Sequence, residues 1–443
     1  MEAVHPPHPR TPYAPLIVNA AITGMVASRE QVPSLPVTAE QIARDARVAY
    51  HLGAGVIHLH ARDADGRPDW RPKAYAEIIS AVRAECPDAV LCASTSGREH
   101  SELDRRAAVL SLEGEAKPDM ASLTLGSLDF ATGPSVNAPE TVEALAGRML
   151  AAGIRPELEV FGSGMASEAR RLLHRGLIRE PLYANLMLGG HHTAPATMRE
   201  LSHLVDSLPH GAVWAAGGIG DYQLKANALA AFAGGHIRTG LEDSARLQAG
   251  DAEVTTNSAL IKRAVALADL AGRRVATPAQ ARELLGLPER KGPCYRIRLA
   301  RGPGDREPML SVLETANMHR VPSPEMDDFD VGEWFVAEVE GEIVGVAGHR
   351  ILRDGPGLAG KTTLLAVLPD QRELGIGRAL QSLRMDLMRD AGATRVITNA
   401  DRPETIAWYE RHFGYERVGE VKKLHEFGLP DVDRWTTLEA PLV

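Results

Sequence analysis

Two histidines one residue apart give the clearest chemical signal in the sequence. His58 and His60 lie in the apolar run Val56-Ile57-His58-Leu59-His60, and the polar run His236–Asp243 lies far downstream. Because side chains alternate across a strand, both imidazoles point to one face. Imidazole is a preferred ligand of Zn²⁺, and a catalytic zinc commonly takes two histidines and a glutamate. We therefore predict a zinc site formed by His58, His60 and Glu242.

The alternative interpretation is that both histidines only form hydrogen bonds to backbone at a strand end. Their shared parity and the following Ala61-Arg62-Asp63 favour the metal. A second pair, His191 and His192, follows Gly189-Gly190. Adjacent residues on an extended segment point to opposite sides, so at most one could join the metal. We interpret this pair as loop residues over the site.

Length and composition narrow the class of protein. A chain of 443 residues is longer than one core usually organises, which predicts two domains. A net charge of -9, with no Lys/Arg-rich run, argues against a nucleic-acid-binding surface. The three cysteines are too few and too scattered for a disulfide framework or a thiolate metal cluster.

The first fifteen residues are rich in proline and predict a flexible N-terminal segment, 1–15. They lack the apolar core of a signal peptide, and no later apolar run is long enough to cross a bilayer. The sequence therefore predicts a cytoplasmic protein without a membrane partner.

Eight short apolar runs alternate with segments that carry helix signals. The runs are Leu16–Thr23, Gly55–Arg62, Ala89–Thr95, Met120–Ser127, Pro156–Phe161, Leu182–Leu188, Ala212–Gly217 and His236–Asp243. Between the first two, Thr38 and Gln41 form a capping box and Gly53 ends the helix. Eight strand-then-helix units predict an α/β fold, a parallel (β/α)₈ TIM barrel over residues 16–287.

The active site of such a barrel lies at the carboxyl ends of its strands. Polar residues gather there in this sequence: His58 and His60 on the second run, Ser94 and Thr95 on the third, Ser122 and Thr124 on the fourth, Glu157 and Glu159 on the fifth, and Arg238 and Glu242 on the eighth. We expect these side chains to converge.

The pattern changes after the barrel. Residues 288–293 predict a linker, and residues 294–443 a second, α+β domain. Trp334–Val339 and Glu342–Gly348 predict a hairpin, Thr362–Leu368 a strand and Gly377–Ala391 a helix. Gly355 to Thr362 matches the Walker A pattern, but Lys361 opens a strand instead of a helix. We interpret this match as a hairpin loop and not as an ATP site.

A better phosphate signal is Arg372-Glu373-Leu374-Gly375-Ile376-Gly377, which follows a strand and opens a helix. Backbone N–H groups at a helix N-terminus bind pyrophosphate. With Tyr409 on a helix that ends near Gly414, residues 294–443 resemble the GNAT superfamily of acyl-CoA-dependent N-acetyltransferases. The resemblance implies that Arg372, Gly375 and Gly377 surround the coenzyme A pyrophosphate and that Tyr409 protonates the departing thiolate.

One residue departs from that pattern: Arg402 stands where many members have an asparagine. Two alternatives stay open at this point. Tyr409 could only pack its helix against the sheet, and the domain could bind coenzyme A for regulation without transferring an acetyl group.

The barrel resembles the β-keto acid cleavage enzymes, or 3-keto-5-aminohexanoate cleavage family. The resemblance rests on five segments in order: Ala20–Gly24, Val56–Arg62, Ser94–Gly97, Pro156–Val160 and Gly235–Asp243. It implies conversion of a β-keto acid and acetyl-CoA to acetoacetate and a new acyl-CoA, in a symmetric homo-oligomer of barrels. The rival interpretation is a zinc-dependent aldolase or hydrolase that does not use coenzyme A.

The resemblance also implies roles for single residues. His58, His60 and Glu242 would hold Zn²⁺; Ser94, Gly97 and Ser122 would bind the substrate carboxylate; Asp243 would be the base, Arg238 would orient it, and Glu159 would line the pocket. A divalent ion beside the keto oxygen neutralises developing enolate charge. Ser122 replaces a common threonine and keeps the hydroxyl. Val26 stands where an ammonium-bearing substrate would need an acid, so we expect an uncharged or bulky substrate end there.

Overall fold

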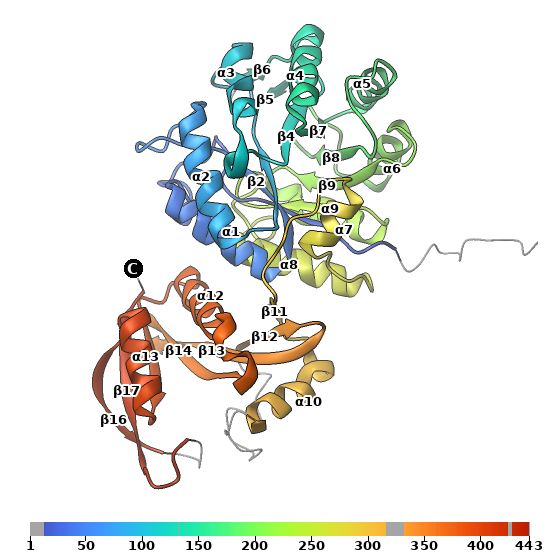
Figure 1. Ribbon diagram of the computed structural model, residues 1–443. Helices are drawn as coiled ribbons and strands as arrows, with labels where there is room; N and C mark the ends of the chain where they lie inside the picture. Colours follow the sequence, from blue (N-terminus) through green and yellow to red (C-terminus); the bar gives the residue numbers. More distant parts are fainter. Residues whose placement is uncertain (1–12, 132, 316–331, 424–427, 443) are drawn as a thin grey trace, which may run out of the picture. The chain divides into compact units, whose positions relative to one another are not determined.

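The computed structural model describes residues 13–131, 133–315, 332–423 and 428–442. The chain divides into two compact units, Met1–Gly292 and Pro293–Val443 (Figure 1). Most of the predicted N-terminal segment 1–15 lies outside the described residues. None of the helices in the described ranges is long and apolar enough to cross a membrane.

The first unit is a closed barrel of eight parallel strands, ordered β1-β10-β9-β8-β7-β4-β3-β2. The strands are β1 (Val18–Ala21), β2 (Ala54–Leu59), β3 (Val90–Ala93), β4 (Met120–Thr124), β7 (Arg155–Val160), β8 (Tyr183–Leu188), β9 (Val213–Gly218) and β10 (His236–Thr239). Each predicted run contains one of them, and the predicted barrel is confirmed. Parallel register brings all eight carboxyl ends to one face, where the βα loops form a site.

Helices surround these strands (Figure 1). They are α1 (Ala39–Leu52), α2 (Pro72–Glu85), α3 (Leu103–Ala107), α4 (Pro139–Ala152), α5 (Ser163–His174), α6 (Met198–Ser207), α7 (Gln223–Phe232), α8 (Asn257–Leu270) and α9 (Pro278–Leu284). The predicted capping box is present in α1, because Thr38 and Gln41 cap each other's backbone N–H groups. A small hairpin, β5 (Leu128–Phe130) and β6 (Gly133–Ser135), follows β4.

The last residues of the first unit run along the amino-terminal end of the barrel. Arg282 donates a hydrogen bond to the carbonyl oxygen of Pro288, and Arg290 donates one to that of Pro87, just ahead of β3. A Cβ on Gly292 would lie 2.5 Å from the Asp88 carboxylate, so the backbone approaches this end closely. The chain therefore leaves the barrel on the side away from the βα loops.

The second unit is a seven-stranded sheet in the order β11-β12-β13-β14-β15-β17-β16. Its strands are β11 (Arg296–Leu299), β12 (Glu333–Val339), β13 (Glu342–Asp354), β14 (Gly357–Val367), β15 (Arg395–Ala400), β16 (Glu416–Lys422) and β17 (Arg434–Pro441), and its helices are α10 (Gly302–Leu313), α12 (Ile376–Asp390) and α13 (Pro403–Phe413). Helix α12 packs on β13 and β14. The predicted hairpin β12–β13, the strand β14 and the helix α12 are confirmed.

The Walker A match falls on the turn between β13 and β14. Asp354 pairs with Gly357 across this turn, and Lys361 and Thr362 lie within β14. No helix follows Lys361, so its backbone cannot form a P-loop. The predicted hairpin is present, but its loop is shorter than predicted: only Gly355 and Pro356 lie between the strands, and Gly357 to Thr362 belong to β14.

Candidate active site

The three predicted zinc ligands meet at the carboxyl end of the barrel. His58 lies in β2, His60 directly follows the end of that strand, and Glu242 lies in the loop after β10. The prediction that β10 extends to Glu242 is wrong: the strand ends at Thr239, because Gly240 turns at φ +148° against the carbonyl oxygen of Ala21.

The spacing of the three donors fits one tetrahedral ion. The Nε2 atoms of His58 and His60 lie 3.4 Å apart. Carboxylate oxygens of Glu242 lie 3.3 Å from His60 Nε2 and 3.7 Å from His58 Nε2. Zinc bonds of about 2.0–2.1 Å in a tetrahedron place donors about 3.3 Å apart. Glu242 Oε2 is buried and has no hydrogen-bond partner within the described ranges. Buried polar atoms normally have a partner, so a cation bound here would satisfy this oxygen.

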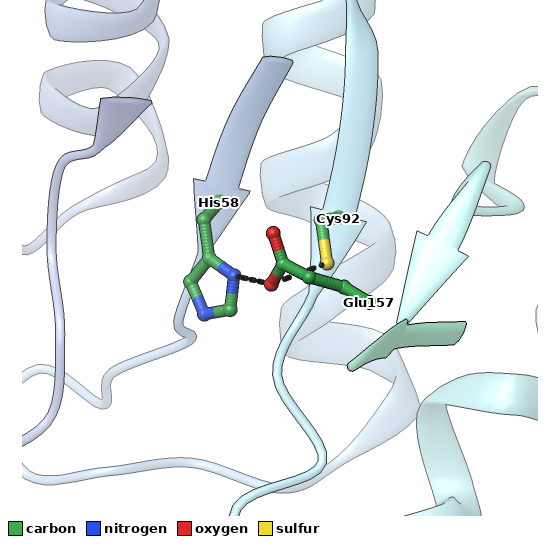
Figure 2. A group of neighbouring side chains, drawn as sticks. All are labelled: His58, Cys92 and Glu157. Carbon is green, nitrogen blue, oxygen red and sulfur yellow. Dashed lines mark hydrogen bonds and ion pairs between the residues drawn. The ribbon is translucent and has the colours of Figure 1, made fainter. Parts of the chain in front are cut away.

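Glu157 on β7 orients the first histidine (Figure 2). Its Oε2 lies 2.6 Å from His58 Nδ1, and the Cys92 thiol donates to the same oxygen at 3.2 Å. Although burial opposes ionisation, His58 and Arg238 lower the pKa of Glu157 to about 2. An ionised partner at Nδ1 keeps the proton there and leaves Nε2 for a metal.

His58, Cys92 and Glu157 also form a possible ligand group by proximity. His58 Nδ1 and Glu157 Oε2 lie 2.6 Å apart. Two ligand atoms of one tetrahedral zinc ion lie about 3.3 Å apart, so this pair is too close to coordinate the same ion. Burial, with Glu157 adding to it, also raises the pKa of the Cys92 thiol well above its usual range. This group therefore supports the site with His58, His60 and Glu242 and does not form another.

Arg238 joins the predicted ligand Glu242 to the predicted base Asp243. Its Nη2 donates to Glu242 at 2.7 Å and its Nε to Asp243 at 3.0 Å. Burial opposes ionisation of Glu242, but His60, His58 and Arg238 hold its pKa well below the usual range. Burial raises the pKa of Asp243; Arg238 opposes this rise, and the Glu242 charge adds to it. Asp243 is thus the better proton acceptor of the two carboxylates.

Of the remaining predicted pocket residues, two line the cavity and two do not. Glu159 faces the site, accepts a hydrogen bond from Thr124 at 2.6 Å and lies 3.7 Å from Arg238. Ser94 also lines the cavity. Ser122 and Gly97 do not line it. The Ser122 hydroxyl accepts the Thr95 N–H at 3.1 Å.

These groups open into a cavity of about 550 Å³. Its polar end contains His60, Glu242 and Asp243. Val26 lies on its wall, 52% exposed. The second histidine pair lies in the loop after β8, where His192 pairs with Asp129 at 3.0 Å and takes no part in the metal group.

A close backbone approach fixes the predicted ligand Glu242. Gly24, in the loop after β1, has φ +62°, and a Cβ there would lie 2.8 Å from Glu242 Cγ and 2.9 Å from its Cα. Only glycine fits both this conformation and this distance. The sequence signal for this role was the position of Gly24 directly after the apolar run Leu16–Thr23.

The second unit has its own cavity, of about 800 Å³. β14 and β15 pair only from Ala359 to Lys361 with Arg395 to Ile397, and later residues of both strands line the cavity. Its wall includes all four predicted coenzyme A residues: Arg372, Gly375, Gly377 and Tyr409. No described side chain caps the N-terminus of α12, which leaves its first N–H groups for an anion.

Tyr409 lies on α13 with its hydroxyl held from behind. Arg384, fully buried, donates to the Tyr409 oxygen at 3.0 Å. Because the guanidinium supplies that hydrogen bond, the tyrosine proton is available to another acceptor. Arg402, the departure from the GNAT pattern, lines the same cavity.

Comparison with known proteins agrees with both units. A profile of the β-keto acid cleavage enzyme family matches residues 15–287, and one of the acetyltransferase (GNAT) family matches residues 306–415. A 3-keto-5-aminohexanoate cleavage enzyme from Fusobacterium nucleatum is 36% identical over 274 residues, which cover 61% of this chain and 98% of that enzyme.

Two further relatives have other substrates in their names. A 3-oxoadipate:acetyl-CoA acetyltransferase from Cupriavidus necator is 36% identical over 62% of this chain and 95% of its own length. A 3-dehydrocarnitine:acetyl-CoA trimethylamine transferase from Rhizobium meliloti is 29% identical over 62% of this chain and 97% of its own length. The apo structure of ObcA, 23% identical with a TM-score of 0.51, covers 58% of this chain and 66% of that chain, and shows the fold alone.

The chain therefore belongs to the β-keto acid cleavage enzyme family and carries a GNAT-type acetyltransferase domain.

Proposed function

We propose that this member of the β-keto acid cleavage enzymes is a zinc enzyme in which His58, His60 and Glu242 hold the ion. The observation that carries the proposal is the set of three donors at tetrahedral spacing beside Asp243. When bound, Zn²⁺ would act as a Lewis acid on the substrate's keto oxygen. Glu157 orients His58 through the hydrogen bond to its Nδ1, and Arg238 orients the base Asp243.

Asp243 begins the reaction by taking a proton from the carbon between the ketone and the carboxylate. Its raised pKa suits this task, because a general base works best when its pKa approaches the working pH. The resulting carbon nucleophile attacks the acetyl thioester, forms a carbon–carbon bond and releases the coenzyme A thiolate. The thiolate then attacks the original keto carbon and cleaves the bond to the neighbouring carbon. Acetoacetate takes back the proton, and a new acyl-CoA remains.

Arg238 keeps this base in place during both proton transfers. Its Nε bond to Asp243 fixes the carboxylate, and its Nη2 bond to Glu242 ties the base to the ligand set. Ser94 faces the cavity and would receive the β-keto carboxylate. The resemblance predicts the same role for Gly97 and Ser122, which do not line the cavity. Glu159 adds a polar wall.

The substrate end that faces Val26 is uncharged or bulky in this proposal. An exposed valine on the cavity wall offers no counter-charge to an ammonium group. A strong preference for an amine-bearing β-keto acid over its matched neutral analogue would contradict this part of the proposal.

The test is a mass-spectrometric screen of β-keto acids with acetyl-CoA and added zinc, in which acetoacetate is the product sought. Omission of acetyl-CoA separates the proposal from its rival. A zinc-dependent aldolase or hydrolase would still consume the keto acid, whereas this enzyme would not.

The metal set has a separate test. Replacement of His58 or His60 by alanine should abolish zinc binding, measured as bound zinc per chain. The double replacement of His191 and His192 is the matched control, and it should leave the zinc content unchanged. Loss of zinc in the control would refute the ligand assignment.

For the second domain we propose acetyl-CoA-dependent N-acetyl transfer, with the coenzyme in the cavity beside Arg372, Gly375 and Gly377. Tyr409 is the proposed acid, since Arg384 holds its oxygen and leaves its proton available. A panel of amines with acetyl-CoA tests this activity. Binding without transfer to any amine would favour the alternative, a regulatory coenzyme A-binding domain. The symmetric oligomer and the cytoplasmic location implied above stay predictions.

A further inference from the structure

A buried arginine lies behind the loop after β3, and none of the roles above uses it. Arg106, on α3, is only 4% exposed. Its Nε donates to the carbonyl oxygen of Thr95 at 2.9 Å, and its Nη2 donates to Asn137 Oδ1 at 2.7 Å. These two bonds tie the loop after β3 to the segment that precedes α4. The guanidinium therefore fixes the backbone of residues 94–97 from the inside.

The charge of Arg106 is not neutralised by a partner. In the part of the chain that the structure describes, no carboxylate forms an ion pair with Arg106, and its Nη1 is buried without a hydrogen-bond partner. Burial lowers the pKa of Arg106, and the charge of Glu159 opposes this only in part. Glu159 itself lies 3.7 Å from a second cation, Arg238. A buried cation in this state is stabilised by an anion that binds nearby.

Gly97 gives the guanidinium its place behind the loop. A Cβ on Gly97 would lie 2.8 Å from Arg106 Nη1 and 2.9 Å from its Cζ, so a larger residue would displace the guanidinium. Gly97 does not line the substrate cavity, and this close approach supplies a physical reason for glycine at the position. The glycine and the arginine thus form one unit.

A second, smaller cavity joins Arg106 to the reacting end of the site. It measures about 30 Å³, and its walls include His60, Ser94 and Arg106. Ser94 borders both this space and the substrate cavity. Its Oγ accepts the Ser96 N–H at 3.2 Å, which leaves the Ser94 hydroxyl proton for an anion. In such a buried setting a charge acts over several ångströms with little screening.

We infer that Arg106 is a positioning residue for the β-keto carboxylate: it holds residues 94–97 in the binding conformation and places a positive charge behind them. The inference rests on the proposed function. It makes the negative charge of the substrate, and not only its shape, the property that this loop recognises. The site should therefore select an ionised β-keto acid over the uncharged amide of the same acid.

The experiment uses the full-length, zinc-loaded protein and two probes of similar shape, 3-oxohexanoate and 3-oxohexanamide, which differ in the charge of the terminal group. Calorimetric titration without acetyl-CoA gives both dissociation constants for the wild type, Arg106→Met, Arg106→Lys and Gly97→Ala. Arg273→Met is the matched control, because Arg273 is equally buried, donates to the carbonyl oxygens of Ala231 and Ala14, and lies outside both cavities. Circular dichroism and the bound zinc per chain check each variant.

The wild type should bind the acid at least about tenfold more tightly than the amide, and Arg106→Met should reduce this preference to about twofold or less. Arg106→Lys should retain most of the preference, since it keeps the charge without the forked hydrogen bonds. Gly97→Ala should lower the preference by displacing the guanidinium, and it supplies the test if Arg106→Met does not fold. Arg273→Met should leave the preference unchanged.

Equal weakening of acid and amide binding in Arg106→Met, or equal losses in the Met and Lys variants, would show a purely structural role and overturn the inference. A wild type without a preference for the acid also overturns it. Acetoacetate formation from 3-oxohexanoate and acetyl-CoA tests the reaction separately. If the preference depends on Arg106 but no acetoacetate is formed, the inference stands and the reaction is wrong. If acetoacetate is formed and the preference survives Arg106→Met, the reaction stands and the inference is wrong.

Discussion

Glu157→Gln isolates the contribution of a residue that touches no substrate atom. The carboxylate lies fully buried, 2.6 Å from His58 Nδ1, and also accepts a hydrogen bond from Asn19 at 2.6 Å. Glutamine keeps the shape but removes the negative charge. If its amide nitrogen faces His58, the imidazole proton moves to Nε2, and the metal loses that ligand.

The expected cost follows from the strength of this bond. A hydrogen bond to a charged group contributes about 1.5–3 kcal/mol, and loss of such a partner typically weakens metal binding by about 10–100-fold. At about 2 kcal/mol, the zinc dissociation constant should rise about 30-fold. Competition with a chromogenic zinc chelator at constant pH measures this change directly.

Glu159→Gln is the matched control, two residues along the same strand. Glu159 accepts a hydrogen bond from Thr124 and contacts neither histidine. The zinc dissociation constant of the Glu159→Gln protein should therefore stay within about twofold of the wild type. A Glu157→Gln protein that folds and binds zinc as tightly as the wild type would refute the reasoning, since His58 would then need no charged partner.

Three further outcomes are expected. Gly24→Ala should displace Glu242 and lower zinc affinity by at least about tenfold while the barrel stays folded, measured by the same competition; an unchanged affinity would contradict the close-contact argument. Burial lowers the pKa of His236 to about 3, so its unfolded form gains a proton as the pH falls below about 6.5 and stability falls with it. His236→Asn, which keeps an acceptor for the Ile17 N–H, should reduce the stability lost between pH 7 and 5.5 by about 1 kcal/mol in urea unfolding of the barrel, and an identical pH dependence would be the contrary result. Tyr409→Phe should slow acetyl transfer by about 100-fold with unchanged acetyl-CoA affinity; undiminished turnover would exclude it as the acid.

The sequence was sufficient for the barrel because each strand is a short apolar run bounded by helix signals. It also predicted that His58 and His60 meet Glu242: strand parity aligns the two histidines, and the common carboxyl end of the strands brings the loop that carries Glu242 to them. The GNAT-type fold of the second domain was predicted from the order of a strand, a glycine-rich turn and a helix, which are β14, the turn at Gly375 and α12 in the structure. In both units, local patterns determine which end of the sheet carries the polar residues.

The role of Glu157 and the stacking of Arg98 on Phe130 could not be predicted in this way. Glu157 was visible as a polar residue on its strand, but its partner His58 lies 99 positions away, and no local pattern encodes that pairing. The stacking of Arg98 on Phe130 likewise joins the loop after β3 to strand β5, 32 positions apart. For Ser122 the sequence predicted a site role, but the structure turns its hydroxyl to the Thr95 backbone, because the buried Thr95 N–H donates a hydrogen bond to it.

The course of residues 288–292 bears on how such a two-part enzyme can arise. The polypeptide departs from the end of the barrel that carries no chemistry, so a gene fusion at this point inserts nothing into the loops that shape the substrate chamber. Because residues 288–292 leave the βα loops uninterrupted, exchange of the appended domain would not alter those loops. The same join offers protein engineers a place to attach a different partner enzyme.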